Sequence, residues 1–173
     1  LQTMLVGGAT AAGATLGRDT ASAATLPVPR EDAVGLLYDT TLCIGCKACV
    51  VACQDANGLP RDTSGIDDKY NAPLALSARA KNVIKLYKGG NEATTSFMKA
   101  QCMHCVDPAC VSACMIGALR KGDKGIVSYN VDYCVGCRYC EIACPFNVPK
   151  FEWTKVAPQI VKCELCRHRL AEG

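Results

Sequence analysis

Fourteen cysteines gathered in four groups constrain this chain more than any other feature of its sequence. The first and third groups have the spacing C-x2-C-x2-C-x3-C, and the second has C-x2-C-x4-C-x3-C. The fourth group opens with C-x2-C, seven residues before the given sequence ends. The thiols belong to Cys43, Cys46, Cys49 and Cys53; Cys102, Cys105, Cys110 and Cys114; Cys134, Cys137, Cys140 and Cys144; Cys163 and Cys166.

These thiols could bind zinc, form disulfides or bind iron-sulfur clusters, and the spacing of the cysteines distinguishes among the three. A structural zinc site usually takes two ligands from one knuckle and two from another, which leaves the third thiol of each triplet without a use. Disulfides between cysteines so close together would close tiny loops that constrain little of the unfolded chain. Disulfide-dense scaffolds are also mostly smaller secreted domains. A [4Fe-4S] cluster needs four thiolates, so the spacing favours iron-sulfur clusters over zinc and disulfides.

The segment CVGCRYCEIACP, residues 134–145, carries the most specific form of this pattern. In bacterial ferredoxins with this spacing, the fourth cysteine ligates the other cluster of a two-cluster protein. Cys134, Cys137 and Cys140 are therefore predicted to hold one cluster, while Cys144 reaches its partner. Pro145 lacks an N–H and suits a backbone that turns away from the cluster.

Composition argues against other functions. The chain has 173 residues, half of them hydrophobic, but one Trp and three Phe, so metal sites rather than large side chains are expected to organise the interior. The net charge of +3 comes from scattered Lys and Arg, which does not indicate nucleic-acid binding. No catalytic constellation or phosphate-binding loop stands out. His104 is expected to be a hydrogen-bond donor near a cluster or a packed loop residue rather than a ligand, and His168 a surface residue.

Short strands and short helices are expected around the cysteine groups. We therefore expect an α+β fold of tandem bacterial-ferredoxin-like modules organised around [4Fe-4S] clusters. Helices are predicted to start around the last cysteine of each group, as in Ala109–Ile116. Residues 54–99 are expected to form an insertion with one strand, Val83–Tyr87. The strands predicted to lead into cysteine groups are Leu36–Tyr38, Ile126–Tyr129 and Gln159–Val161.

The N-terminal residues differ in composition from the rest. They carry no charge before Arg18, are rich in Gly and Ala, and reach the small-residue sequence Ala21-Ser22-Ala23. This pattern is typical of an export signal whose charged beginning is missing, with a flexible surface tail as the alternative. We expect four parts: residues 1–23 as the remnant of a twin-arginine type signal, 24–91 as a first ferredoxin half with the insertion, 92–157 as a complete two-cluster module, and 158–173 as the truncated start of the fourth group.

Four segments carry a resemblance to a known family: LYDTTLCIGCKACVVACQDAN, QCMHCVDPACVSAC, GIVSYNVDYCVGCRYCEIACPFNVPKFEW and KCELCRHRLAEG. Together they resemble the four-cluster ferredoxin-like electron-transfer subunits of membrane-bound redox enzymes. Within that family they are most similar to the iron-sulfur subunits of periplasmic uptake hydrogenases of the hydrogenase 2 type. The resemblance covers nearly all of residues 36–173.

The resemblance implies which thiols share a cluster, and we number each set after the group that supplies most of its thiols. Two sets are complete, while the other two would each need a further cysteine beyond Gly173, so the sequence is expected to be a fragment at both ends. Set 1 is Cys43, Cys46 and Cys49; set 2 is Cys102, Cys105, Cys110 and Cys144; set 3 is Cys134, Cys137, Cys140 and Cys114; set 4 is Cys53, Cys163 and Cys166.

The resemblance also implies a function. Four [4Fe-4S] clusters in the full-length protein would pass single electrons between a nickel-iron hydrogenase and a quinone-reactive membrane subunit, on the periplasmic side of the cytoplasmic membrane. The chain itself would have no catalytic residue, no small-molecule substrate and no nucleic-acid partner. One alternative is the beta subunit of a molybdenum or tungsten enzyme, such as formate dehydrogenase or dimethyl sulfoxide reductase. Another is a free-standing polyferredoxin that binds several partners transiently.

Overall fold

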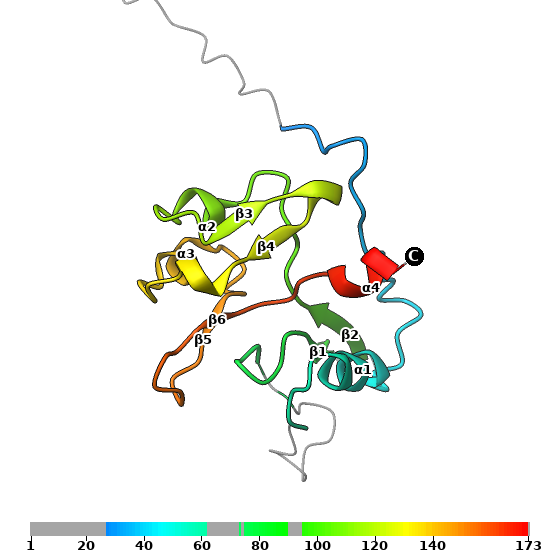
Figure 1. Ribbon diagram of the computed structural model, residues 1–173. Helices are drawn as coiled ribbons and strands as arrows, with labels where there is room; N and C mark the ends of the chain where they lie inside the picture. The colour runs from blue at the N-terminus through cyan, green and yellow to red at the C-terminus, as the bar shows by residue number, and fades with distance from the viewer. Residues whose placement is uncertain (1–26, 62–72, 74, 90–94, 173) are drawn as a thin grey trace, which may run out of the picture.

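The computed structural model describes residues 27–61, 73, 75–89 and 95–172 (Figure 1). The expected export-signal remnant, residues 1–23, lies outside them. All the elements are short. In chain order they are α1 (Ala48–Ala56), β1 (Val83–Lys88), β2 (Thr95–Ala100), α2 (Ala109–Ser112), β3 (Leu119–Lys121), η1 (Asp123–Gly125), β4 (Val127–Tyr129), η2 (Val131–Tyr133), α3 (Tyr139–Ala143), β5 (Lys150–Phe151), β6 (Ile160–Val161) and α4 (Arg167–Glu172).

The strands pair as three antiparallel two-stranded sheets, β1 with β2, β3 with β4 and β5 with β6. In Figure 1 the β3–β4 hairpin lies with α2 and α3 in one half of the molecule, and the β1–β2 hairpin lies with α1 in the other. The segment from β6 to α4 runs from the first half to the second. The fourth cysteine group lies on this connecting segment, between the two halves.

The buried core is small, and thiols form part of it. Its central residues are Leu119, Val127, Ile160 and Cys140, the last only 7% exposed. The partly buried residues packed against them include three more cysteines: Cys110, Val111, Cys114, Tyr129, Cys134 and Phe151. Three short strands supply too few aliphatic side chains to fill this interior, so the cysteine loops complete it.

Most of the predicted strands are present. Val83–Tyr87 is confirmed as a strand that runs one residue further, to Lys88. Ile126–Tyr129 and Gln159–Val161 each begin one residue later than predicted, at Val127 and Ile160.

Three expectations about the elements were wrong. Leu36–Tyr38 forms no strand; it is held instead by its side chains, since the Tyr38 hydroxyl donates to the Phe97 carbonyl at 3.0 Å. The insertion contains a second strand, β2, which pairs with β1 along its whole length. The helix predicted over Ala109–Ile116 ends at Ser112.

Each of α1, α2 and α3 begins one residue before the third cysteine of its group. For α2 this residue is Ala109, the predicted start, whereas α1 and α3 begin earlier than predicted, since their starts were expected around the fourth cysteine. The residues before α1 and α3, Lys47 and Arg138, have left-handed φ values of 59° and 65°. A left-handed residue turns the chain sharply, so the loop that carries the first two thiols ends there. No helix within the described ranges is long and apolar enough to cross a membrane.

Candidate metal centres

All fourteen cysteines are free thiols in the structure, so disulfides do not organise this fold. Within the described part of the chain, no three His, Cys, Asp or Glu side chains form a group that could hold a single metal ion. Eight of the fourteen thiols instead line two cavities, as described below.

The four cysteine groups share one loop conformation. In each group the residue two positions after the first cysteine has a positive φ: Gly45 at 71°, His104 at 45°, Gly136 at 72° and Leu165 at 52°. This conformation turns backbone N–H groups towards sulfur. The N–H groups of Gly45 and Leu165 each donate to the first thiol of their group, Cys43 and Cys163, at 3.4 Å. Hydrogen bonds to sulfur are one means by which proteins set cluster potentials.

The four thiols of set 3 line one cavity. Cys114 comes from the end of the second group, and Cys134, Cys137 and Cys140 come from the third group. The rest of the lining is mainly apolar and includes Ile116, Ala118, Leu119, Val135 and Ile160. Burial, followed by the nearby thiols Cys114, Cys110, Cys134 and Cys137, raises the pKa of Cys140 to about 11. A bound metal would relieve this repulsion, because metals bind thiolates.

Set 2 lies beside set 3. Burial raises the pKa of Cys110, and the charges of Cys102, Cys144 and Cys105 raise it further. These are the other three members of set 2. Cys144 therefore lies near the second group although it follows the third in sequence, which is the arrangement that the cross-over requires. The ligand sets themselves stay a prediction.

The outer thiols meet between the two halves of the molecule. Burial raises the pKa of Cys53, and the nearby thiols Cys163 and Cys166 raise it further. These three and Cys49 line an apolar cavity of about 370 Å³, together with Leu36, Ala52 and Leu165. Tyr38 lies close to Cys43 and Cys49 of set 1, and its pKa is raised by burial and by its hydrogen bond with Cys43.

These cavities fit [4Fe-4S] clusters. Their donors are thiols, the soft ligands that iron-sulfur clusters use. Their walls are mainly apolar, and backbone N–H groups point at the sulfur atoms. A ring also closes over one face of each glycine loop: an added Cβ would lie 2.6 Å from Cδ1 of Phe97 at Gly45, and 3.3 Å from Cε2 of Phe151 at Gly136.

A tyrosine and a phenylalanine from a hairpin lie beside the first cysteine group, and an equivalent pair lies beside the third. These residues were not identified from the sequence. Tyr38 and Tyr129 each precede the first cysteine of their group by five residues. Both are hydrogen-bonded to a neighbouring hairpin, Tyr38 to the Phe97 carbonyl and Tyr129 to the Ile160 N–H. Burial raises the pKa of Tyr129 well above its usual value, and its hydrogen bond with Cys134 adds to this. The equal spacing in the sequence was a signal that could have revealed the pair.

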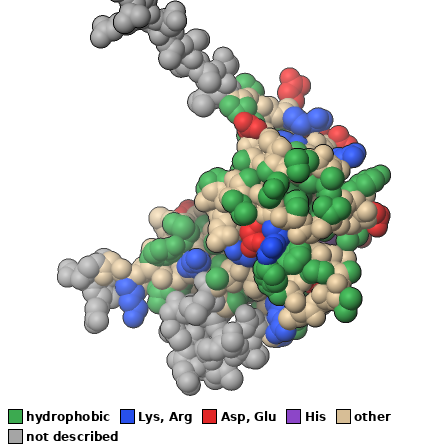
Figure 2. Space-filling view, turned by 90° about the vertical axis from the view of Figure 1, so that its left-hand side faces the viewer, with side chains coloured by type: hydrophobic (Ala, Val, Ile, Leu, Met, Phe, Trp, Pro, Cys, Tyr) green, Lys and Arg blue, Asp and Glu red, His purple; other side chains and the backbone are tan. Residues whose placement is uncertain are grey.

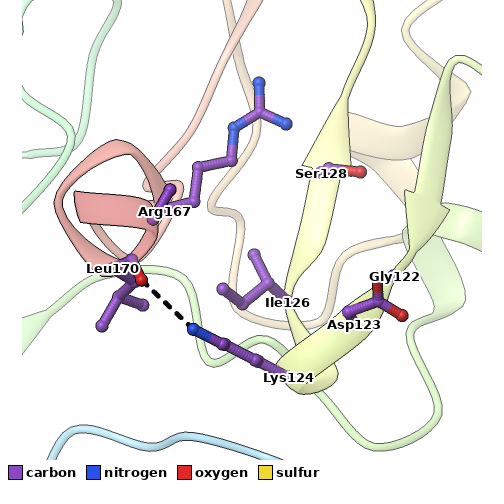
Figure 3. Close-up of a pocket in the computed structure, with 8 residues that line it drawn as sticks. Gly122, Asp123, Lys124, Ile126, Ser128, Arg167 and Leu170 are labelled. Carbon is purple, nitrogen blue, oxygen red and sulfur yellow. Dashed lines mark hydrogen bonds between the residues drawn. The ribbon is translucent and has the colours of Figure 1, made fainter. Parts of the chain in front are cut away.

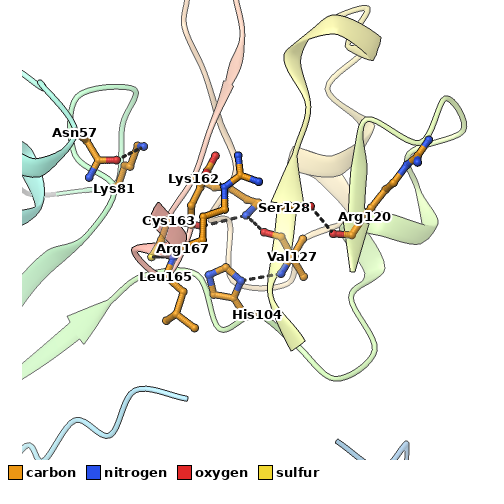
Figure 4. A network of polar contacts seen from close by, with 11 residues as sticks. Asn57, Lys81, His104, Arg120, Val127, Ser128, Lys162, Cys163, Leu165 and Arg167 are labelled. Carbon is orange, nitrogen blue, oxygen red and sulfur yellow. Dashed lines mark hydrogen bonds and ion pairs between the residues drawn. The ribbon is translucent and has the colours of Figure 1, made fainter. Parts of the chain in front are cut away.

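A polar network supports the second cysteine loop (Figure 4). Nδ1 of His104 accepts a hydrogen bond from the Val127 N–H at 3.0 Å, so the proton of the neutral ring is on Nε2. Nε2 is buried and has no hydrogen-bond partner among the described residues. Burial, and then the charges of Lys162 and Lys121, lowers the pKa of His104 to about 4. Lys121 Nζ donates to the carbonyls of His104, Cys105 and Gly125.

Two surface features lie outside the thiol sets. An open pocket of about 350 Å³ between η1 and α4 has no cysteine in its lining, and Lys124 donates there to the Leu170 carbonyl (Figure 3). Hydrophobic side chains are spread over the face drawn in Figure 2. Several exposed ones lie next to cysteines in sequence, including Leu42, Ile44, Met115 and Val135, all more than 70% exposed. His168, in α4, takes part in none of these sites.

The chain matches the 4Fe-4S dicluster domain family twice, over residues 42–118 and 93–173. Together the two matches include every cysteine. The chain thus belongs to the ferredoxin-like iron-sulfur proteins that carry such domains, and its cofactors are [4Fe-4S] clusters.

Among curated relatives, the chain is 44% identical over 154 residues to the hydrogenase-2 operon protein HybA of Escherichia coli O157:H7, covering 84% of this chain and 46% of that protein. It is 36% identical over 143 residues to the iron-sulfur subunit of nitrate-inducible formate dehydrogenase of Escherichia coli K12, covering 81% of this chain and 48% of that protein. It therefore spans about half the length of these relatives. The chain is an iron-sulfur electron-transfer subunit similar to both.

Proposed function

We propose that this chain is part of the electron-transfer subunit of a nickel-iron hydrogenase. It would pass single electrons between the hydrogen-oxidising subunit and a quinone-reactive membrane subunit, on the periplasmic side of the cytoplasmic membrane. The 44% identity to HybA, a hydrogenase-2 operon protein, supports the choice of catalytic partner. The expected export-signal remnant supports the location.

The observation that carries an electron-transfer role is the continuous succession of thiol sets. Cys140 of set 3 lies near Cys110 of set 2. Cys102 of set 2 lies near Cys163 of set 4. Set 4 in turn lines one cavity with Cys49 of set 1. These neighbouring thiols support the order 3–2–4–1 for the proposed sets, from one half of the molecule to the other.

We further propose the ligand sets 1 to 4 as defined above, with residues 24–91, 92–157 and 158–173 as the parts of the chain that carry them. When bound, a [4Fe-4S] cluster supplies a one-electron carrier. The residues of this chain do the rest. The cysteines bind, Leu119 and Ile160 exclude water from set 3, and backbone N–H groups such as that of Gly45 donate to sulfur.

Exposed apolar side chains beside the cysteines support docking of partner subunits. Met115 follows Cys114 directly and is 81% exposed, and Ile44 follows Cys43 and is 78% exposed. Exposed apolar residues that gather at one site often mark an interaction surface. These residues lie at sets 3 and 1, the two ends of the proposed succession.

The second candidate is the beta subunit of a molybdenum or tungsten enzyme such as formate dehydrogenase, which the 36% identity to a formate dehydrogenase iron-sulfur subunit favours. Both candidates would use the same set of clusters and would differ only in the catalytic partner. A free polyferredoxin would have no stable partner at all.

The test is a metal analysis of the native complex. The full-length protein would carry an affinity tag in anaerobically grown cells, and nickel, molybdenum and tungsten would be measured in the purified complex against iron. An untagged strain is the control for non-specific capture. Nickel in near-stoichiometric amount is expected. Molybdenum or tungsten without nickel would replace the hydrogenase proposal with the second candidate, and a monomer with iron alone would favour the polyferredoxin.

A further inference from the structure

Lys162 is the one charged side chain that is buried in the described part of the chain, with 3% of it exposed. It precedes the first cysteine of the fourth group, in the segment that connects the two halves of the molecule. Its Nζ donates to the carbonyls of Val127 and of Cys163, the latter at 3.0 Å (Figure 4). The ammonium group is thus held at a fixed place by backbone on two sides.

No described carboxylate forms a salt bridge with Lys162. The nearest acidic residue in sequence, Glu164, is paired with Arg167 at 2.7 Å. His104, which lies beside Lys162 in Figure 4, accepts the Val127 N–H through Nδ1, and an imidazole ring supplies no negative charge. Burying a charge without a partner is costly, and buried charges are normally paired. Within the described part of the chain, Lys162 is therefore a buried cation without a salt-bridge partner.

Lys162 lies between the loops of two different sets. Its Nζ donates to the Cys163 carbonyl and to the Val127 carbonyl, and the Val127 N–H donates to Nδ1 of His104, in the loop between Cys102 and Cys105. Cys102 and Cys105 are members of set 2, and Cys163 is a member of set 4. Lys162 is therefore at the junction where the succession of thiol sets crosses from one half of the molecule to the other.

We propose that Lys162 is a positioning residue whose fixed positive charge raises the reduction potentials of the clusters bound by sets 2 and 4. A [4Fe-4S] cluster with four thiolate ligands is an anion, and it gains one more negative charge on reduction. A cation buried nearby stabilises the reduced state more than the oxidised state, because Coulomb interactions are strong where water is excluded. Set 3 lies further along the succession and should be affected less.

The inference rests on the ligand sets proposed above, but not on the identity of the catalytic partner. The experiment is an EPR-monitored redox titration of the full-length, cluster-loaded protein with Lys162→Gln. Glutamine can still donate to the two carbonyls but carries no charge. We expect unchanged iron content and a tenfold lower ratio of reduced to oxidised cluster at a fixed potential for two of the clusters, which is about 59 mV for one electron.

A control variant separates charge beside the thiols from other effects of losing a cation. Lys155→Gln removes an exposed cation that pairs with Glu152. It should leave every potential close to that of the unmodified protein.

Each outcome decides the proposal. Unchanged potentials in a Lys162→Gln protein with full iron content would overturn it, as would an equal shift in Lys155→Gln. If Lys162→Gln does not load iron, Lys162→Met is titrated instead, since it fills the site without charge. Failure of both neutral variants to load, with normal loading of Lys162→Arg, would also overturn the proposal, because a charge that only tunes potentials must be dispensable for assembly. If the metal analysis finds molybdenum or tungsten instead of nickel, the proposed function changes but the conclusion about Lys162 does not.

Discussion

The two glycine loops offer a matched pair of substitutions whose cost follows from the structure. Gly45 and Gly136 occupy the same position in the first and third cysteine groups, with nearly equal φ values of 71° and 72°. They differ in the space available. An added Cβ would lie 2.6 Å from Cδ1 of Phe97 at Gly45 but 3.3 Å from Cε2 of Phe151 at Gly136.

The expected cost has two parts. The left-handed conformation costs a non-glycine residue about 1–2 kcal/mol at either position. At Gly45 the ring of Phe97 must also move, and overpacking of this kind costs about 1–3 kcal/mol more. Gly45→Ala should therefore lower the free energy of unfolding by about 2–5 kcal/mol, and Gly136→Ala by about 1–2 kcal/mol, because a shift of a few tenths of an ångström relieves the contact with Phe151.

The assay is the midpoint temperature at which the cluster-loaded protein loses its visible absorbance, with iron content measured beforehand. A loss of 1 kcal/mol lowers the midpoint by about 2–4 °C in a protein of this size. The Gly45→Ala midpoint should fall about 2–12 °C further than that of Gly136→Ala, which is the overpacking cost of about 1–3 kcal/mol converted at that rate.

A double-mutant cycle identifies the cause. Phe97→Leu removes the ring atoms that an alanine at position 45 would strike, so it should cost less in the Gly45→Ala protein than in the unmodified protein. The coupling should be about 0.5–3 kcal/mol, as is usual for residues in contact. Equal effects of the two glycine substitutions, or no coupling between positions 45 and 97, would refute the steric reasoning.

Three further predictions concern the thiol sets. Cys144→Ala should deplete the cluster of the second group, while Cys114→Ala should deplete that of the third, as judged by iron content and EPR; the opposite result would contradict the cross-over. Tyr129→Phe removes the hydroxyl that accepts from the Ile160 N–H, so it should destabilise the protein by about 0.5–1.5 kcal/mol, measured against Tyr139→Phe, whose side chain is half exposed. Iron removal with a chelator under reducing conditions should abolish near-ultraviolet circular dichroism, since thiols form part of the core; an unchanged spectrum would show that aliphatic packing suffices.

The cysteine spacing predicted more of this protein than its hydrophobic pattern did. Thiols at fixed intervals dictate the chemistry, because a cluster accepts few ligand geometries. They do not dictate where helices begin. The sequence gives no sign that Lys47 and Arg138 adopt left-handed conformations, which are unusual for such residues. The prediction therefore placed the starts of α1 and α3 near the fourth cysteine instead of the third.

Two errors came from tertiary context. Leu36–Tyr38 reads as a strand, but no neighbouring strand pairs with it, and the Tyr38 hydroxyl holds it through the Phe97 carbonyl instead. Thr95–Ala100 lies in a polar insertion, and its pairing with β1 is a contact that local pattern does not reveal. Local sequence likewise does not distinguish Lys162 from the other scattered Lys and Arg residues, because burial of a cation depends on loops that are distant in sequence.

The internal repeat shows where the two halves of the molecule are alike and where they are not. Tyr38 with Phe97 and Tyr129 with Phe151 surround the first and third groups in the same way, since each tyrosine precedes its cysteines by five residues and each ring covers a loop glycine. Lys162 breaks this symmetry. If both halves made only equivalent contacts, all four thiol sets would have similar electrostatic surroundings. Lys162, a cation buried at the junction, makes the surroundings of sets 2 and 4 differ from those of sets 1 and 3. Directional electron transfer requires clusters with different reduction potentials, and the charge of Lys162 supplies one source of such a difference.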